Sequence, residues 1–457
     1  CSEDMARQEH VRWSSRVTTP MLIGLGLLGL MLLLMVIRVP IAATMLIPGF
    51  IGYWLLSSPT ALLAHLKGVA FARLSIYDLS VIPLFLLMGY FATQGGLSRD
   101  LFRAANAVIG HVRGGMAMAA ILACAMFGTV CGSSVATAAT IGQVAIPEMK
   151  RLGYSGRVYT ATLAAGGTLG ILIPPSVILV VYGILTEQNI ARLFAAAIIP
   201  GIIATFGYLL AIAWLARRHP EHCPAAPALA RDERVAACKP VWPIVLIFLV
   251  VFGGIYGGYF SPTEAASVGA LATFFVALAK GELTASGIRA SFLGTASNTG
   301  MIFLIFLGAD LLNSALAISQ MPALLAQWVS ASGASPVLIV VLILVFYIVL
   351  GGVMDEMSMI LLTLPIVFPI VMGLDLYGLD AQSKAIWFGM LILMVVQIGL
   401  IAPPVGLNVY VINGMAKDVS MAESYRGVLP FLVTDFIRTG LLVAFPPLTL
   451  WLVKFMN

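Results

Sequence analysis

The chain contains 457 residues, of which 60% are hydrophobic and 10% are charged, and its mean hydropathy is +1.02. This composition provides too little polar surface to cover a soluble globule of this length, so it predicts a polytopic membrane protein. The formal net charge of +5 comes from basic residues scattered among loops, which argues against nucleic-acid binding and favours a role in membrane orientation.

Residues 1–19 form a polar N-terminal segment that begins at Cys1 and does not have the pattern of a signal peptide. An exposed or processed end and a piece of a longer polypeptide both remain open. Long apolar runs follow at residues 21–37, 241–260, 336–350 and 429–451. Each approaches the roughly 20 residues that a helix needs to cross the bilayer, where the backbone must satisfy its own hydrogen bonds.

The first half of the chain, residues 20–216, contains an interrupted apolar stretch at about residues 115–150. Gly132, Ser133 and Ser134 separate two apolar arms, each about 24 Å long as helices, so the stretch could enter and leave the membrane by the same face. Two ordinary crossing helices are the alternative. A broken helix is expected at about residues 158–186, because Pro174 and Pro175 remove backbone donors and clash with the preceding turn.

A polar linker at residues 217–240, "RRHPEHCPAAPALARDERVAACKP" from Arg217, is expected to lie in the cytoplasm as the hinge between two halves. The second half, residues 241–457, repeats the order of the first. A hairpin is expected at about residues 336–371, with its tip at 351–356, and a broken helix at about residues 385–413. Interrupted apolar segments at corresponding places in two halves are typical of secondary transporters.

The interruptions gather oxygen atoms at the depth of the membrane. Each double proline should free carbonyl groups of its helix, and such backbone is tolerated only where protein or a water-filled cavity surrounds it. The hairpin tips add the hydroxyls of Ser133, Ser134 and Thr137 and the carboxylate of Asp355. Oxygen-only sites suit hard cations, and half-helix N-termini can meet an anionic substrate. The sequence therefore predicts a sodium-coupled carrier of organic anions.

Ionisable residues inside apolar segments mark candidate functional sites because burying their charge is costly. They are Arg38, Asp310, Asp355, Glu356 and the pair Asp435 and Arg438. The pair is spaced three apart on a helix and is expected to neutralise itself in a structural role. Arg38 could reach the membrane interface, or it could pair with the carboxylate of the substrate.

Cysteine and histidine residues give no catalytic pattern. Cys124 and Cys131 lie in an apolar stretch, and Cys223 and Cys238 lie in the linker without tight metal-ligand spacing. No G-x-S-x-G motif is present, so neither a metal enzyme nor an intramembrane hydrolase is expected. The protein is predicted not to be an enzyme.

Several long motifs resemble one transporter family in the same order. They are "GSSVATAATIGQVAIPEMKRLGYS", "GTLGILIPPSVILVVYGI", "SPTEAASVGAL", "MDEMSMILLTLPIVFPIV" and "IGLIAPPVGLN". Together they resemble the large membrane subunit of tripartite ATP-independent periplasmic (TRAP) transporters, from about Met21 to the C-terminus.

This resemblance implies a sodium-driven importer of organic acid anions in a bacterial or archaeal inner membrane. It implies an all-α fold of two inverted repeats, each with a re-entrant hairpin and a broken helix, in which a transport region moves against a scaffold as an elevator. The implied partners are a small four-helix membrane subunit and a periplasmic binding protein that delivers the carboxylate. Which carboxylate is carried stays open, and a permease subunit of an ATP-driven importer is the alternative function.

Matching positions imply the residues of the site. Two or more sodium ions would bind at the tips and breaks, at Gly132, Ser133, Ser134, Gly170, Pro174, Gly352, Asp355, Gly399 and Pro404. The expected substrate-binding residues are Arg38, Ser134, Thr137, Pro175, Ser176 and Asn408. The chain has Ala402 where the family often has Thr, so only backbone oxygen can serve at that position.

Overall fold

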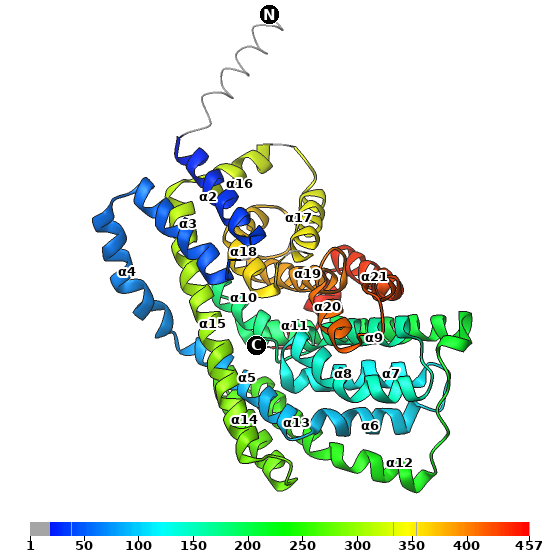
Figure 1. Ribbon diagram of the computed structural model, residues 1–457. Helices are drawn as coiled ribbons and strands as arrows, with labels where there is room; N and C mark the ends of the chain where they lie inside the picture. Colours follow the sequence, from blue (N-terminus) through cyan, green and yellow to red (C-terminus); the bar gives the residue numbers. More distant parts are fainter. Residues whose placement is uncertain (1–18, 38, 332, 353, 457) are drawn as a thin grey trace, which may run out of the picture. The chain divides into compact units, whose positions relative to one another are not determined.

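The computed structural model describes residues 19–456 apart from positions 38, 332 and 353, and the regular elements in that part of the chain are all helical (Figure 1). Seven of these helices are long and apolar enough to cross a membrane, or up to nine spans if two bent helix pairs each count as one. The predicted class, an all-α polytopic membrane protein, is confirmed.

The described chain divides into two compact units, each assembled from separate stretches of sequence. The first unit contains residues up to Ile76, Gly300–Val340 and Ile360–Tyr377. The second unit contains Tyr77–Thr299, Val341–Met359 and the residues from Gly378 onward. This division differs from the two halves on either side of the linker.

The first unit is held together by close helix packing and by an ion pair between Arg73 and Asp310. Its helices are α2 (Thr19–Val36), α3 (Ile41–Leu56), α4 (Pro59–Leu74), the later part of α15 (Ala285–Ile318), α16 (Met321–Ala331), the start of α17 (Pro336–Gly351) and most of α18 (Glu356–Met372). A Cβ added at Gly49 of α3 would lie 2.8 Å from the backbone nitrogen of Leu312, so α3 and α15 touch through their backbones. Arg73 pairs with Asp310, which neutralises that intramembrane carboxylate.

The second unit contains most of the helices. They are α5 (Val81–Gln94), α6 (Leu97–Ile109), α7 (Gly115–Cys131), α8 (Ser134–Arg151), α9 (Gly156–Leu172), α10 (Val177–Thr186), α11 (Ile190–Arg218), α12 (Arg231–Cys238), α13 (Trp242–Tyr256), α14 (Pro262–Ala279), α19 (Ala381–Ile401), α20 (Leu407–Met415), α21 (Met421–Ala444) and α22 (Pro447–Leu450). Two further helices, α17 (Pro336–Gly351) and α18 (Glu356–Met372), bring their facing ends into this unit.

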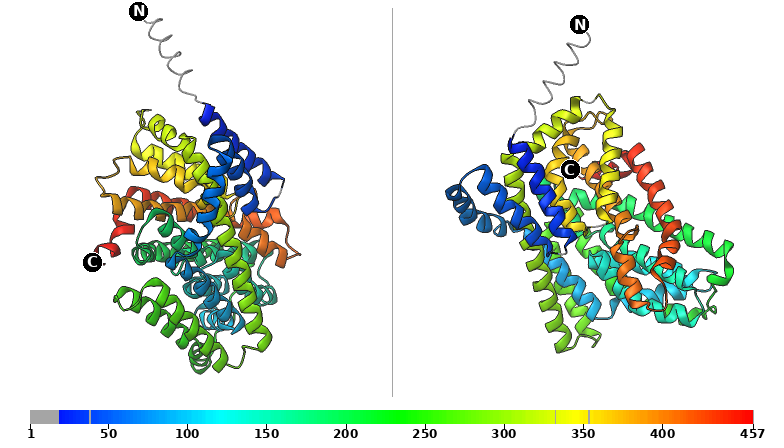
Figure 2. Two further views of the ribbon diagram at one scale, coloured as in Figure 1. Left: turned by 90° about the vertical axis from the view of Figure 1, so that its left-hand side faces the viewer. Right: turned by 45° about the horizontal axis from the view of Figure 1, so that its top comes forward.

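Helix α9 lies at the centre of the second unit, with α7 and α8 packed against it (Figure 1). Figure 2 shows α20 and α21, in orange and red, beside the cyan and green helices α8, α9 and α11. Every residue from Val158 to Leu172 is buried, and the segment from Ala164 to Gly170 is rich in alanine and glycine. Small side chains allow helices to approach closely, which explains how α9 accepts neighbours on all sides.

Serine and proline residues set the helix ends that matter for the site. Ser133 begins α8 by accepting a hydrogen bond from the Ala136 N–H at 3.4 Å, and Ser176 begins α10 in the same way with the Leu179 N–H. Pro174 and Pro175 separate α9 from α10, and the two helices bend by 41°. Pro403 and Pro404 separate α19 from α20 in the same manner.

Candidate functional site

Four short segments of the second unit carry most of the sequence-predicted site residues. We call residues 132–134 the first tip and residues 351–356, apart from position 353, the second tip. Residues 173–176 are the first break and residues 402–406 the second break. Each tip lies between two helices, and each break follows the C-terminal end of a long buried helix.

The first tip lies directly against the first break. Gly132 has a φ of +65°, in the left-handed region that favours glycine, and ends α7. A Cβ at this position would lie 2.8 Å from the carbonyl oxygen of Pro175. The sequence-predicted residues Gly132 and Pro175 are therefore in contact, and a larger residue at 132 would separate tip from break.

The second tip packs on the second break in a similar way. The Val405 N–H donates a hydrogen bond of 3.3 Å to the Gly352 carbonyl oxygen. A Cβ at Gly399 would lie 2.7 Å from the Cα of Gly351, and one at Gly352 would lie 3.0 Å from Cδ of Pro404. Three predicted positions, Gly352, Gly399 and Pro404, therefore meet at one place.

The double prolines leave specific carbonyl groups without their helical donors. In an α-helix each carbonyl accepts from the N–H four residues later, and proline has no N–H. The carbonyl groups of Gly170 and Ile171 would need N–H donors at Pro174 and Pro175, which have none. The last helical bond before the break is donated by the Ile173 N–H to the Leu169 carbonyl oxygen. At the second break, by the same rule, Gly399 and Leu400 lose donors at Pro403 and Pro404.

Ser134 and Glu356 join the two tips. The Ser134 hydroxyl donates a hydrogen bond of 3.2 Å to Oε1 of Glu356, and Ser134 is fully buried. Each is the first residue of its helix, so the N-termini of α8 and α18 converge on one carboxylate. The sequence indicates Glu356 only as an acid inside an apolar segment. Because Glu356 directly follows Asp355, nothing in the sequence shows which of the two acids contacts the first tip.

Asp355 lies at the second tip but uses its carboxylate locally. Oδ2 accepts from the N–H groups of Met357 and Ser358 at 3.1 and 3.2 Å, and Oδ1 accepts from the Ser358 hydroxyl at 2.5 Å. This is the arrangement of a helix N-cap, a position at which aspartate is among the preferred residues. Asp355 therefore begins α18, whereas Glu356 reaches across to the first tip.

Three buried oxygen atoms in this region have no hydrogen-bond partner among the described residues. They are Oγ1 of Thr137, Oδ1 of Asn408 and Oε2 of Glu356. A Cβ at Gly170 would lie 2.3 Å from the Thr137 oxygen, and one at Gly167 would lie 3.0 Å from Nδ2 of Asn408. Thr137 and Asn408 thus face neighbouring turns of α9. Buried unpartnered oxygens are costly, so a group of them indicates a site for a ligand.

A buried ion pair supports the α9 segment that carries this site. The side chains of Arg438 and Asp435 are 2% and 1% exposed, and an Arg438 guanidinium nitrogen lies 2.9 Å from Oδ1 of Asp435. This confirms their predicted pairing. Arg438 also donates to Oε1 of Gln397 at 2.8 Å, and Nε2 of Gln397 donates to the Thr168 carbonyl oxygen at 2.8 Å. The Tyr208 hydroxyl donates to Asp435 at 2.9 Å and lies 3.1 Å from the Thr168 hydroxyl. Thr168 is therefore fixed from two sides.

The remaining predicted residues have separate structural contacts, apart from Arg38. The hydroxyls of Ser133 and Ser176 cap their own helices. The Pro404 carbonyl accepts from the Tyr425 hydroxyl at 2.9 Å. Arg38 lies outside the described residues.

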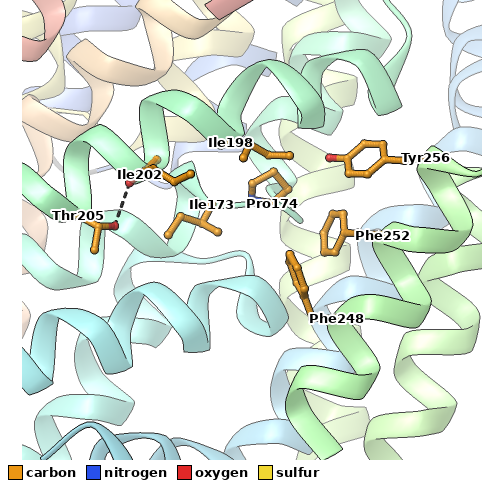
Figure 3. Close-up of a pocket in the computed structure, with 9 residues that line it drawn as sticks. Ile173, Pro174, Ile198, Ile202, Thr205, Phe248, Phe252 and Tyr256 are labelled. Carbon is orange, nitrogen blue, oxygen red and sulfur yellow. Dashed lines mark hydrogen bonds between the residues drawn. The ribbon is translucent and has the colours of Figure 1, made fainter. Parts of the chain in front are cut away.

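An apolar pocket of roughly 240 Å³ adjoins the first break (Figure 3). Ile173 and Pro174 form one side of it, and Phe248, Phe252 and Tyr256 of α13 form the other. Its lining offers almost no polar atoms, so it does not suit a carboxylate. The oxygen atoms of the tips, rather than this pocket, define the candidate site.

Comparisons with known proteins identify the family. Residues 28–448 match the family described as "Tripartite ATP-independent periplasmic transporter, DctM component". The C4-dicarboxylate TRAP transporter large permease protein DctM of Pseudomonas aeruginosa is 36% identical over 383 residues, which are 83% of this chain and 87% of the relative. The sialic acid TRAP transporter large permease protein SiaM of Vibrio cholerae is 29% identical over 377 residues, 82% of this chain and 86% of the relative.

A solved structure shares the fold. The YdaH transporter of Alcanivorax borkumensis, described as having an unusual topology, superposes with a TM-score of 0.54 at 16% identity, and the match covers 85% of this chain and 88% of that one. Together with the match along most of the sequence, the likeness to large permeases settles the family. The chain belongs to the TRAP transporters, as a large membrane subunit of the DctM type.

Proposed function

We propose that this subunit imports organic acid anions by sodium symport. The observation that supports the proposal best is the set of unpartnered buried oxygens of Thr137, Asn408 and Glu356 beside the carbonyls that the double prolines release. Unwound backbone and side-chain oxygens at broken helices are the usual ligands of coupling cations. The proposed sodium residues are those expected from the sequence, with Glu356 added: Gly132, Ser133, Ser134, Gly170, Pro174, Gly352, Asp355, Gly399, Pro404 and Glu356.

Charge at the tips gives a physical reason for coupling. The N-termini of α8 and α18 converge near Glu356, and helix N-termini favour negative charge. An unneutralised Glu356 carboxylate would repel a second anion at the same place. A sodium ion beside this carboxylate would cancel the repulsion and leave the helix N-termini to receive the substrate. Bound sodium would thus raise the affinity for the anion, which is what symport requires.

The substrate class follows from the relatives and from the site. The relatives named for C4-dicarboxylates and for sialic acid transport different molecules, and both molecules carry a carboxylate. The proposed substrate contacts are Ser134, Thr137, Pro175, Ser176 and Asn408, of which Ser134, Thr137, Ser176 and Asn408 are fully buried polar residues. Enclosed polar groups of this kind can match a carboxylate in a dry site.

Partners and mechanism follow from membership of a tripartite family. We place the subunit in the bacterial inner membrane with a small membrane subunit, and a periplasmic binding protein supplies the anion. Both tips and both breaks belong to the second compact unit. This unit is the candidate moving part of an elevator mechanism. The ATP-driven alternative is set aside because the family is described as ATP-independent.

Transport in proteoliposomes tests the proposal. The chain would be reconstituted with its small subunit, and its binding protein would be added outside with radiolabelled succinate or N-acetylneuraminic acid as trial carboxylates. Accumulation is expected with an inward sodium gradient and not with choline, whether or not ATP is present. Equal accumulation in sodium and choline would overturn sodium coupling.

A further inference from the structure

A cluster of metal-ligating side chains lies far from the tips, in the turn that follows α11. His219, Glu221 and His222 each present one ligand atom, and these atoms all lie within 4.8 Å of one another. Nδ1 of His219 is 3.4 Å from Oε1 of Glu221, and Nε2 of His222 is 3.7 Å from the same oxygen. The motif H-P-E-H from His219 to His222 is shorter than the usual zinc patterns, so its spacing alone does not predict a metal site.

The separations are close to those of a metal centre. Zinc binds histidine nitrogen at about 2.0–2.1 Å in tetrahedral geometry, which places neighbouring ligand atoms about 3.3 Å apart. The two distances to the Glu221 oxygen, 3.4 and 3.7 Å, are close to this value, and the two imidazole nitrogens lie within 4.8 Å of each other. Small side-chain rotations would therefore bring two imidazoles and one carboxylate around a single ion.

Backbone hydrogen bonds hold the turn in place on both sides. The His219 N–H donates to the Leu215 carbonyl at 2.8 Å, which continues α11 to the first ligand. The Ser155 N–H donates to the His222 carbonyl at 3.3 Å, and the Gly114 N–H donates to the Cys223 carbonyl at 3.1 Å. The ligand-bearing turn is therefore anchored to the segments that begin α7 and α9. Because the turn is already ordered, an ion that binds there loses little free energy to ordering the backbone.

The ligand atoms are also accessible. The side chains of His219, Glu221 and His222 are 51%, 60% and 44% exposed. The imidazole rings stack with centroids 5.6 Å apart and an angle of 30° between their planes. An ion could enter from water, bind the three side chains and keep a water molecule as a fourth ligand.

We propose that His219, Glu221 and His222 bind one divalent transition-metal ion of the zinc class. Imidazole and carboxylate ligands suit Zn²⁺ better than Mg²⁺, which prefers oxygen alone. The ion would hold the turn from His219 to His222 in one conformation at the end of α11. The site is independent of the sodium site and of the transported anion.

Metal titration of the full chain tests this proposal. The protein would be purified through a tag without histidine, treated with EDTA, and titrated with ZnCl₂ or MgCl₂ by calorimetry. One Zn²⁺ per chain is expected, and Mg²⁺ should give no heat at the same concentration. Loss of a ligand in His222→Ala should weaken zinc binding by about ten-fold or more.

Matched variants separate this site from other zinc binding. His111→Ala removes another exposed histidine outside the cluster and should leave zinc affinity unchanged. The double variant His219→Ala/His222→Ala should lose the site and also the zinc-dependent rise in melting temperature. Equal zinc binding by the double variant and the wild type would overturn the proposal. If the double variant does not give a monodisperse peak in gel filtration, Glu221→Gln takes its place with the same expectation.

Discussion

Ser134 and Glu356 are hydrogen-bonded at 3.2 Å although 222 positions separate them in the sequence. The bond connects the first residues of α8 and α18, so it joins the two tips at their helix N-termini. The other carboxylate oxygen of Glu356 has no hydrogen-bond partner among the described residues. The contact thus combines a structural bond on one oxygen with a free, buried ligand atom on the other.

Replacing Glu356 tests whether this free oxygen serves the cation. Glu356→Gln keeps an oxygen that can accept from Ser134, but it removes the charge. We expect the sodium concentration for half-maximal uptake to rise about ten-fold or more, equivalent to roughly 1.4 kcal/mol. Sodium titration of uptake in proteoliposomes gives the value.

Asp355→Asn is the neighbouring comparison. Asparagine also caps helices, so the bonds to Met357 and Ser358 can persist while the charge is lost. We expect the sodium concentration for half-maximal uptake to rise less than in Glu356→Gln, because the Asp355 oxygens already accept hydrogen bonds from three donors. A larger effect at Asp355 would reverse the roles assigned to these two acids.

Thr137→Val should separate stability from function. The Thr137 hydroxyl is buried without a partner in the described part of the chain, so its removal should leave the melting temperature unchanged or slightly raised. If the hydroxyl binds sodium or substrate, uptake at limiting concentrations should fall several-fold. Thr162→Val is the control, since Thr162 has an equally buried and unpartnered hydroxyl on α9, about 12 Å along the helix from Gly170. Similar uptake by the two variants would remove Thr137 from the site.

The parts of the site that were predictable are those with a local signal. Composition sets the membrane class, and the double prolines and the Gly-Ser-Ser interruption locate the breaks and the first tip. The i,i+3 spacing of Asp435 and Arg438 predicts their ion pair. Each of these features depends on residues that are close in sequence.

The parts that were not predictable depend on long-range packing. Nothing near Glu356 in sequence indicates Ser134, and nothing near Gln397 indicates the Thr168 carbonyl, 229 positions away. Asp355 and Glu356 are adjacent acids, and only the fold decides which one caps α18 and which one reaches the other tip. The cluster at His219, Glu221 and His222 is an exception: it is local, but its H-P-E-H spacing is shorter than the usual zinc patterns, and only the turn geometry brings the three ligand atoms together.

Gly170→Ala should disrupt the packing between α8 and α9. The added Cβ would lie 2.3 Å from Thr137 Oγ1 and 2.7 Å from the Ser133 carbonyl oxygen, and the latter cannot rotate away. Overpacking of this kind costs about 1–3 kcal/mol, so a lower melting temperature and loss of uptake are expected. Gly440→Ala in α21 is the control because no atom lies within 4 Å of its added Cβ. That variant should melt at or slightly above the wild-type temperature.

The Asp435–Arg438 pair should behave as a coupled unit. Arg438→Met would leave the Asp435 carboxylate buried, with the Tyr208 hydroxyl as a donor but without its cation, and would remove the donor to Gln397. Breaking one partner of a buried pair costs about 3–5 kcal/mol, whereas replacing both partners with apolar residues is often close to neutral. We therefore expect Arg438→Met to lower the melting temperature strongly and Asp435→Leu/Arg438→Met to recover most of it. Uptake should recover less than stability, because Gln397 would still lack the arginine that orients it toward Thr168 at the site. A double variant that melts as early as Arg438→Met would contradict this coupling between the two side chains.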